Sequence, residues 1–225
     1  MSHNPERRLS TGGLPPIRVR EQCVVEKVPS HHDPGVPCYT AWMREEIEKV
    51  PEGWSASDFT IANKRPQRSF QIYDTTPQAA NPDHLQTLAE EFQTELCKDH
   101  GVGGRNKTAR IDVWAKPFAA DASAGEEMKI DTCKAHILAE IAARETSGDN
   151  SFHVSELCSH VRWKRFLLIM DQPEESWNED EGGFLAVYWD PHSSYQGTPE
   201  GPETHTRRYT REELGTLLED ITNFF

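Results

Sequence analysis

The sequence contains no long apolar run. Nowhere in its 225 residues do the roughly 18 consecutive apolar side chains occur that a membrane-spanning helix needs. We therefore expect no membrane partner. Residues 1–16, MSHNPERRLSTGGLPP, also lack the apolar segment of a secretory signal. This favours a soluble, cytoplasmic protein, with the nucleus left open as an alternative.

Cysteine is scarce and does not form a disulfide framework. Five cysteines, an odd number, occur at irregular spacing in a long chain, which is typical of thiols in a reducing compartment. Two of them precede a histidine by three positions, at Cys97–His100 and Cys133–His136, and a helix places such pairs on one face. The sequence leaves open whether these two pairs meet in space. Because their spacing matches no zinc finger or ribbon, we predict no metal.

A phosphate-binding loop is also missing. Residues 101–108, GVGGRNKT, resemble one, but Asn106 stands where the second glycine belongs. The loop also follows a predicted helix and precedes a predicted strand, the reverse of the order that points backbone amides at a phosphate. We therefore predict no cofactor.

Positive charge is in short supply. Lys and Arg number 24 against 37 Asp and Glu, which gives a net charge of −13. A surface this acidic repels phosphate backbones, so we expect no nucleic-acid partner. The same surface favours a protein partner with a basic surface, and a small-molecule ligand remains the alternative.

The N-terminal segment lacks a periodic apolar face. Residues 1–37 hold six prolines and three glycines, a density that stops helices. We predict a flexible tail over residues 1–37, with one short edge strand at Cys23–Val25, and a single domain over residues 38–225. Within the tail, Arg7-Arg8-Leu9-Ser10 resembles a site for basophilic kinases, which makes Ser10 a candidate modification site.

The remaining pattern predicts mixed helices and strands. Apolar residues at helical spacing predict a short helix from Thr40 to Val50 and longer helices over 82–100 and 125–145. A capping box at Thr210 and Glu213 begins a last helix. Alternating or continuous apolar runs predict five strands and a sixth, edge strand; these lie at 58–62, 69–73, 109–114, 166–170, 184–189 and 206–209. We predict an α+β fold, a two-layer sandwich with a mainly antiparallel sheet of about five strands and helices packed on one face.

The most site-like segment follows the predicted strand 184–189. Asp190 and His192 are candidates for acid–base catalysis, since a carboxylate can orient an imidazole. Three aromatic or imidazole side chains nearby are candidates for ligand binding: Trp189, Tyr195 and His205. Loops that leave central strands commonly carry function.

No motif names a reaction. The favoured hypothesis is a non-catalytic binding or regulatory protein that acts through its flexible tail and acidic domain surface. The alternative is a small soluble enzyme with a pocket beside loop 190–205, in which His192 and Asp190 serve as acid–base groups.

Overall fold

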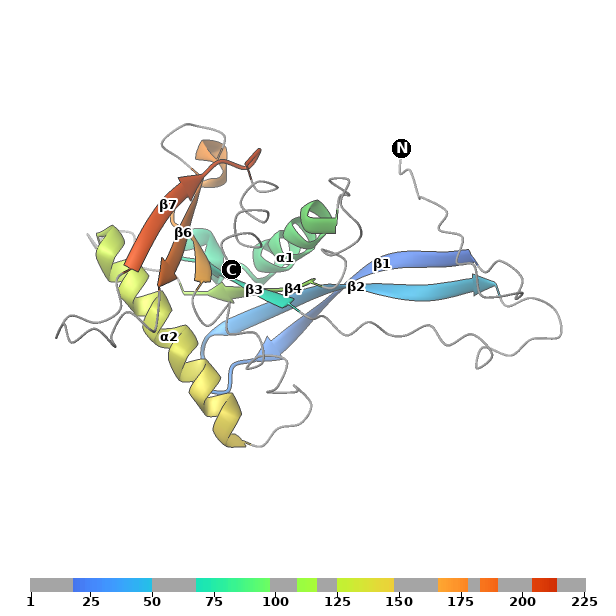
Figure 1. Cartoon of the computed structure of the whole chain (residues 1–225), viewed down its shortest axis with the longest axis horizontal. Coiled ribbons are helices and arrows are strands. Elements are labelled where there is room, and N and C mark those ends of the chain that lie inside the picture. Colours follow the sequence, from blue (N-terminus) through green and yellow to red (C-terminus); the bar gives the residue numbers. More distant parts are fainter. Residues whose placement is uncertain are drawn as a thin grey trace.

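The computed structural model describes residues 18–49, 68–97, 109–116, 125–147, 166–177, 183–189 and 204–213. Within these ranges, seven strands form one sheet in the order β1-β2-β4-β3-β5-β6-β7 (Figure 1). Two α-helices and two short 3-10 helices accompany it. The elements are β1 (Arg18–Pro29), β2 (Pro37–Lys49), β3 (Arg68–Asp74), η2 (Pro77–Ala80), α1 (Pro82–Cys97), β4 (Ala109–Ala115), α2 (Glu126–Ser147), β5 (Phe166–Met170), η5 (Glu174–Ser176), β6 (Phe184–Trp189) and β7 (Thr204–Tyr209).

The sheet is parallel at its centre and antiparallel towards both edges. β3 pairs in parallel with β4 on one side and with β5 on the other. The remaining neighbours pair antiparallel. α1 connects β3 to β4, and the segment that contains α2 leads from β4 past β3 to β5. The carboxyl ends of three strands therefore meet at one edge of the sheet.

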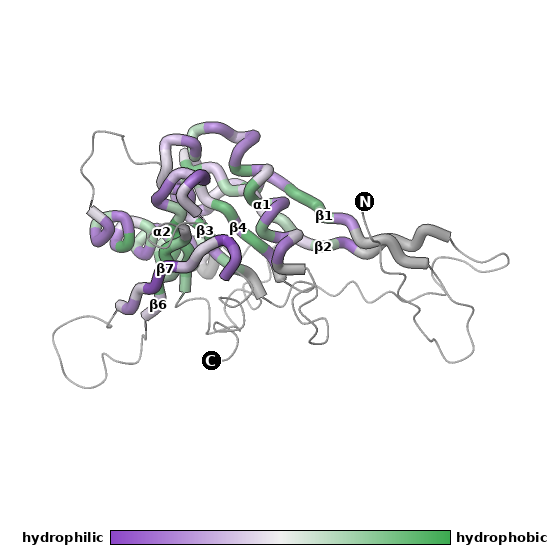
Figure 2. The backbone as a smooth tube through the Cα atoms, turned by 90° about the horizontal axis from the view of Figure 1, so that it is seen from above, coloured by the Kyte–Doolittle hydropathy of each residue, from purple (hydrophilic) through white to green (hydrophobic). Residues whose placement is uncertain are grey.

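The two long helices cover opposite faces of the sheet. Alternate residues of each strand enter two separate apolar clusters, as the period of two along a strand requires. In β3, Ile72 joins the cluster of α1, which includes Leu85, whereas Tyr73 joins the cluster of α2, which includes Ile137. In Figure 2, the central strands are largely green (hydrophobic), and green and purple segments alternate along α2.

The predicted α+β class is confirmed, but the finer architecture was wrong. The sheet has seven strands and is mixed, not five strands and mainly antiparallel. The helices also pack on both faces, not on one. The continuous apolar runs of β5 and β6 already required cover on two sides, because every residue of β5 is buried.

The helix predicted from Thr40 to Val50 is wrong, since residues 40–49 belong to β2, and Val50 lies outside the described residues. Tyr39, Met43 and Ile47 are four positions apart, and a spacing of four keeps residues on one side of a helix and also on one face of a strand. The pairing of β2 with β1 along its length, and with β4 over Cys38–Trp42, decides for the strand.

The described part of the predicted tail joins the sheet. The strand expected at Cys23–Val25 is confirmed in position, and β1 extends it to residues 18–29. Beyond Trp42, β2 pairs only with β1 among the described residues, and this half of the hairpin projects from the sheet (Figure 1). The domain boundary at residue 37 stays a prediction.

The other predicted elements have separate outcomes. Two helices and four strands are confirmed as α1, α2, β3, β4, β5 and β6, and β7 confirms the edge strand. The strand at 58–62 and most of the last helix lie outside the described residues. One half of the predicted capping box is formed, because the Thr210 amide donates to Glu213 Oε2 at 2.8 Å. Among the described helices, none is both long and apolar enough to cross a membrane.

Candidate functional site at the carboxyl edge

The carboxyl ends of β4, β3 and β5 place polar residues side by side. We use the name carboxyl edge for Asp74 to Thr76, Asp171 and the backbone of Lys116, which end or follow these strands. Asp74 is in register with Ala115 of β4 and with Met170 of β5. In sheets with parallel strands, ligands commonly bind outside the carboxyl ends, where successive connections leave to opposite faces. That condition is met here between β3 and β4, because the connection after β3 leads to α1 and the connection after β4 leads to α2, on opposite faces.

Hydrogen bonds fix the end of β3 to both neighbouring strands. The amide of Thr75 donates to the carbonyl of Met170 at 2.9 Å, and the Thr75 hydroxyl donates to the same oxygen at 3.0 Å. On the other side, the Lys116 amide donates to the Asp74 carbonyl at 2.9 Å. Backbone held in this way positions the Asp74 side chain with little freedom.

Asp74 holds a histidine from the first turn of α1. Its side chain is fully buried, and its Oδ1 accepts from the amide of Thr76 at 2.9 Å and from the hydroxyl at 2.7 Å. Its other oxygen, Oδ2, lies 3.1 Å from Nε2 of His84. The His84 side chain is 16% exposed. A buried carboxylate therefore orients a partly exposed imidazole.

This contact sets the tautomer of His84. An ionised carboxylate only accepts hydrogen bonds, so Nε2 must carry the proton that it donates to Asp74. In the neutral ring, Nδ1 is then the basic nitrogen. Nδ1 bonds to no described residue. The arrangement is that of an imidazole oriented by a carboxylate for proton transfer.

Asp171 is occupied by an arginine of β7. Arg208 donates through two nitrogens to the two oxygens of Asp171, at 3.0 and 2.8 Å, and through one of them to Glu126 at 2.8 Å. The hydrogen bond to Asp171 is the main reason that the pKa of Arg208 is raised above its ordinary value. A bidentate pair of this kind joins β5, β7 and α2, and we assign it a structural role.

A buried polar network crosses the face of the sheet that α2 covers. Asp112 accepts from Thr40 Oγ1, Arg110 Nε and Gln71 Nε2 at 2.6, 2.7 and 2.9 Å, and the Trp114 indole donates to Gln71 Oε1 at 2.6 Å. Asp112 is 1% exposed. Its three donors offset the cost of burying the carboxylate, so this network stabilises the sheet.

On the same face, Tyr73 contacts a second histidine. Its hydroxyl lies 2.9 Å from Nδ1 of His136, a buried residue of α2. Tyr73 and Asp74 are consecutive, so the end of β3 holds one histidine on each face of the sheet. Burial raises the pKa of the Tyr73 phenol well above its ordinary value, and the phenol therefore stays protonated.

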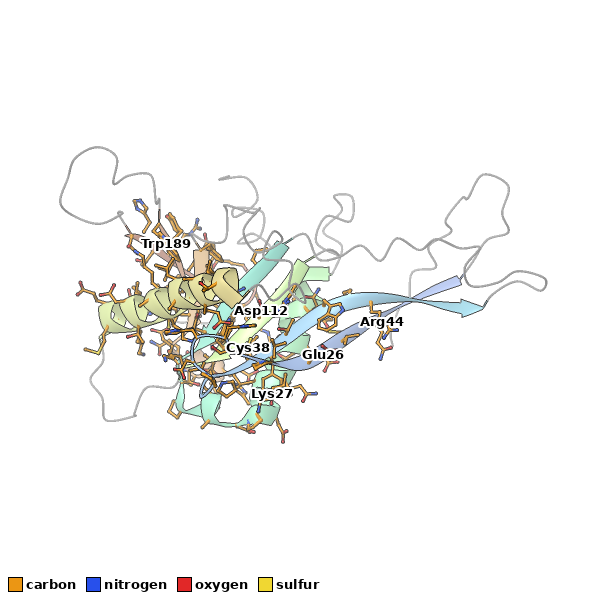
Figure 3. The ribbon with its side chains drawn as sticks, turned by 90° about the horizontal axis from the view of Figure 1, so that it is seen from below. Glu26, Lys27, Cys38, Arg44, Asp112 and Trp189 are labelled. Atoms are coloured by element: carbon orange, nitrogen blue, oxygen red, sulfur yellow. The ribbon has the colours of Figure 1, made fainter. Side chains whose placement is uncertain are left out.

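The structure describes two of the predicted site residues. Trp189 is 4% exposed and packs in the cluster of α2, with Lys134 Nζ 5.1 Å from the centre of its ring. Figure 3 shows Trp189 beside α2, far from Arg44 on the projecting hairpin. His205 is exposed in β7 and stacks on Tyr188 at 5.2 Å. The other four lie outside the described residues, and their roles stay predictions: Asp190, His192, Tyr195 and Ser10.

Reading the sequence did not single out Asp74 or His84, although a signal was present. The predicted strand 69–73 ends directly before Asp74, and Asn81-Pro82 marks a helix start that places His84 in the first turn. When a helix begins a few residues after a strand, its first turn lies near the carboxyl end of that strand. The two residues are ten positions apart, too far for a short motif to reveal.

No metal site is formed by the described residues, because no group of three or more His, Cys, Asp or Glu side chains there could hold an ion. Burial raises the pKa of the Cys133 thiol to about 12, which keeps it protonated and a poor metal ligand. The pair Cys97 and His100 is not tested, since His100 lies outside the described residues.

Comparison with known proteins gives no relative: no family model, no curated protein and no solved structure matches the chain.

Proposed function

We propose that this protein is a small enzyme that binds a small molecule at the carboxyl edge and uses His84 as its acid–base group. Asp74 orients the imidazole and stabilises the imidazolium that forms when Nδ1 takes a proton. The proposal keeps the acid–base chemistry expected of Asp190 and His192 but assigns it to a different pair. The observation that carries it is the contact of 3.1 Å between a fully buried carboxylate and a partly exposed imidazole.

The place of this pair in the sheet supports the proposal. Asp74 ends β3 beside β4, where the connections to α1 and α2 diverge, the usual position of ligands in sheets with parallel strands. The exposed nitrogen of His84 is the basic one, so a bound molecule meets a proton acceptor. The Asp171–Arg208 pair offers no such group, because each of its charges is already matched.

The test combines a screen with one substitution. Metabolites from the main chemical classes are incubated with the protein, and turnover is followed by one-dimensional proton NMR. For any compound that is converted, we expect His84→Gln to lower the rate by roughly 100-fold or more, the usual contribution of a general base. Glutamine keeps a donor towards Asp74, so the thermal midpoint of this variant should stay near that of the wild type.

A matched control uses another histidine that faces solvent. His205→Gln, on edge strand β7, should leave turnover unchanged. Equal rates for wild type and His84→Gln on every converted compound would reject the proposal.

The charge of the chain favours a second candidate, the non-catalytic binding protein. With a net charge of −13, the protein favours a partner with a basic surface. Binding of this kind weakens as salt is added, because exposed charges are screened. Retention on a column of immobilised cationic peptide that is lost in high salt, together with no turnover in the screen, would favour this candidate over the enzyme.

A further inference from the structure

His136 has one ring nitrogen without a partner. The residue is 4% exposed, and among the described residues nothing bonds to its Nε2, whereas Nδ1 lies 2.9 Å from the Tyr73 hydroxyl. Three rings surround the imidazole edge-on, those of Trp114, Tyr73 and His32, with centres 5.2, 5.7 and 5.9 Å away. A buried polar atom without a partner is rare in folded proteins and costs free energy, so it indicates a missing partner.

The tautomer of His136 follows from the number of polar groups that each arrangement leaves without a hydrogen bond. If Nδ1 donated to Tyr73, the phenol hydrogen and the lone pair of Nε2 would both lack partners, because the phenol has no second contact. If Tyr73 donates to Nδ1, only the N–H at Nε2 lacks one. The second arrangement has fewer unsatisfied groups, and we assign it. The missing partner of His136 is therefore a hydrogen-bond acceptor.

A lysine pairs with Asp33, whose neighbour His32 has its ring centre 5.9 Å from that of His136. Its positive charge is the strongest influence on the pKa of His136 after burial, and it also acts on Cys133 of the same helix. This residue is Lys116, and its Nζ lies 3.6 Å from Oδ2 of Asp33. The Asp33 side chain is 43% exposed, so the ion pair is loose and open to solvent.

The other acid near His136 already accepts hydrogen bonds from three donors. Glu140 accepts from the Ser30 hydroxyl at 2.7 Å and from the amides of His31 and His32 at 3.0 and 2.9 Å. Its carboxylate faces the loop between β1 and β2 and is 1% exposed. Asp33 is thus the acid that competes for Lys116.

We propose that His136 and Lys116 form an oxyanion-binding site for small carboxylates or phosphates on the α2 face. One ligand oxygen accepts the N–H of His136, and the ligand displaces the Asp33 carboxylate from Lys116. Asp33, carried on the loop between two strands, stands in for the ligand in the free protein. The site is on the other face of the sheet from His84 and does not depend on the acid–base role proposed there.

The experiment titrates the full-length protein separately with acetate and with inorganic phosphate. The ring nitrogens of His136 are followed by long-range proton–nitrogen NMR. We expect the His136 signals to move and saturate with at least one of the two anions, and the two arms show which is bound. Saturation with chloride at equal ionic strength is the control for a general salt effect.

Two substitutions shift the affinity in opposite directions. Asp33→Asn removes the competing carboxylate and should tighten binding by up to about fivefold, the equivalent of a surface ion pair. Lys116→Met should weaken binding by about tenfold or more. Both side chains are partly exposed, so both variants are expected to fold. His84→Gln should leave the affinity unchanged.

The proposal is overturned if neither anion moves the His136 signals, or if Asp33→Asn binds no more tightly than the wild type. It is also overturned if chloride reproduces the shifts. None of these results bears on His84, so this site and the proposed function stand or fall separately.

Discussion

Tyr73 and Asp74, two neighbours in β3, each contact a histidine from a different helix. Asp74 bonds to the partly exposed His84, and Tyr73 bonds to the buried His136. The surroundings give the two imidazoles different properties. A carboxylate holds the first with its basic nitrogen available, whereas the second is enclosed by rings and presents a donor.

Burial makes His136 sensitive to acid. Burial is the main reason that the pKa of His136 falls to about 4. The positive charges of Lys116 and His32 lower this pKa further, whereas the negative charges of Glu140 and Asp33 raise it. In the unfolded chain the pKa is about 6.5. The unfolded state therefore binds the proton more readily, so stability is complete above about pH 6.5 and falls as the pH drops towards 4.

We expect this group to remove about 2–3 kcal/mol from the free energy of unfolding between pH 7 and pH 4. Urea unfolding of wild type and His136→Phe at a series of pH values isolates the effect, because other carboxylates titrate in both proteins. The difference between the two proteins should change across this window. Parallel pH profiles would contradict the pKa shift.

At the scale of elements, a glycine directly before β6 is required by the packing. Gly183 has a φ of +90°, and a Cβ at this position would collide with the backbone carbonyl oxygen of Tyr209 in β7. A side chain here forces the first pair of the β6–β7 ladder apart, since Phe184 is in register with Tyr209. The join between these two strands therefore depends on this residue.

We expect Gly183→Ala to destabilise the protein by about 2–4 kcal/mol, from backbone strain and from the collision. Gly125→Ala is the matched control, because a Cβ there has no atom within 4 Å. Thermal and urea unfolding of the two variants should differ clearly. Similar losses for both would show that the collision is relieved at little cost.

The sequence predicted an element correctly where the apolar spacing fits either a helix or a strand but not both. It failed where the spacing fits both. β5 and β6 are short apolar runs bounded by polar loops, and α1 has a capped start. In β2, residues four apart fit a helix and a strand equally, and only the pairing with β1 and β4 decides. Pairing between distant segments cannot be read from local spacing.

The pattern of α2 shows why part of the site was missed. Leu138, an apolar residue of α2, is 43% exposed. The buried face of the helix instead includes His136 and Glu140, both less than 5% exposed. A prediction of the buried helix face from apolar residues alone places polar side chains outside the core. Their partners, Tyr73 and Ser30, lie on other elements and complete the burial only in the folded chain.

At the scale of the whole molecule, Glu140 joins the N-terminal hairpin to the second half of the chain. Its carboxylate accepts three hydrogen bonds from the loop that connects β1 and β2. Ser30 is also fixed within the loop, where its Oγ accepts from the amide of Asp33 at 2.8 Å. The loop thus takes its shape around a side chain from α2.

We expect Glu140→Ala to lower the free energy of unfolding by about 3–5 kcal/mol, because it leaves buried donors without an acceptor. Asp131→Ala, which removes an exposed carboxylate from the same helix, should change stability by about 0.5 kcal/mol or less. Urea unfolding measures both. A small loss for Glu140→Ala would mean that the loop finds other acceptors or opens to water.

The parallel centre of the sheet also has a consequence for how the chain reaches its fold. β1 and β2 are neighbours in sequence and can pair as soon as both have left the ribosome, whereas Ile72 of β3 must wait for Leu168 of β5. Contacts between such distant positions form slowly, because a long loop has to close first. Until synthesis has passed β5, β3 lacks its neighbour on that side, and an unpaired strand edge of this kind favours aggregation of the nascent chain.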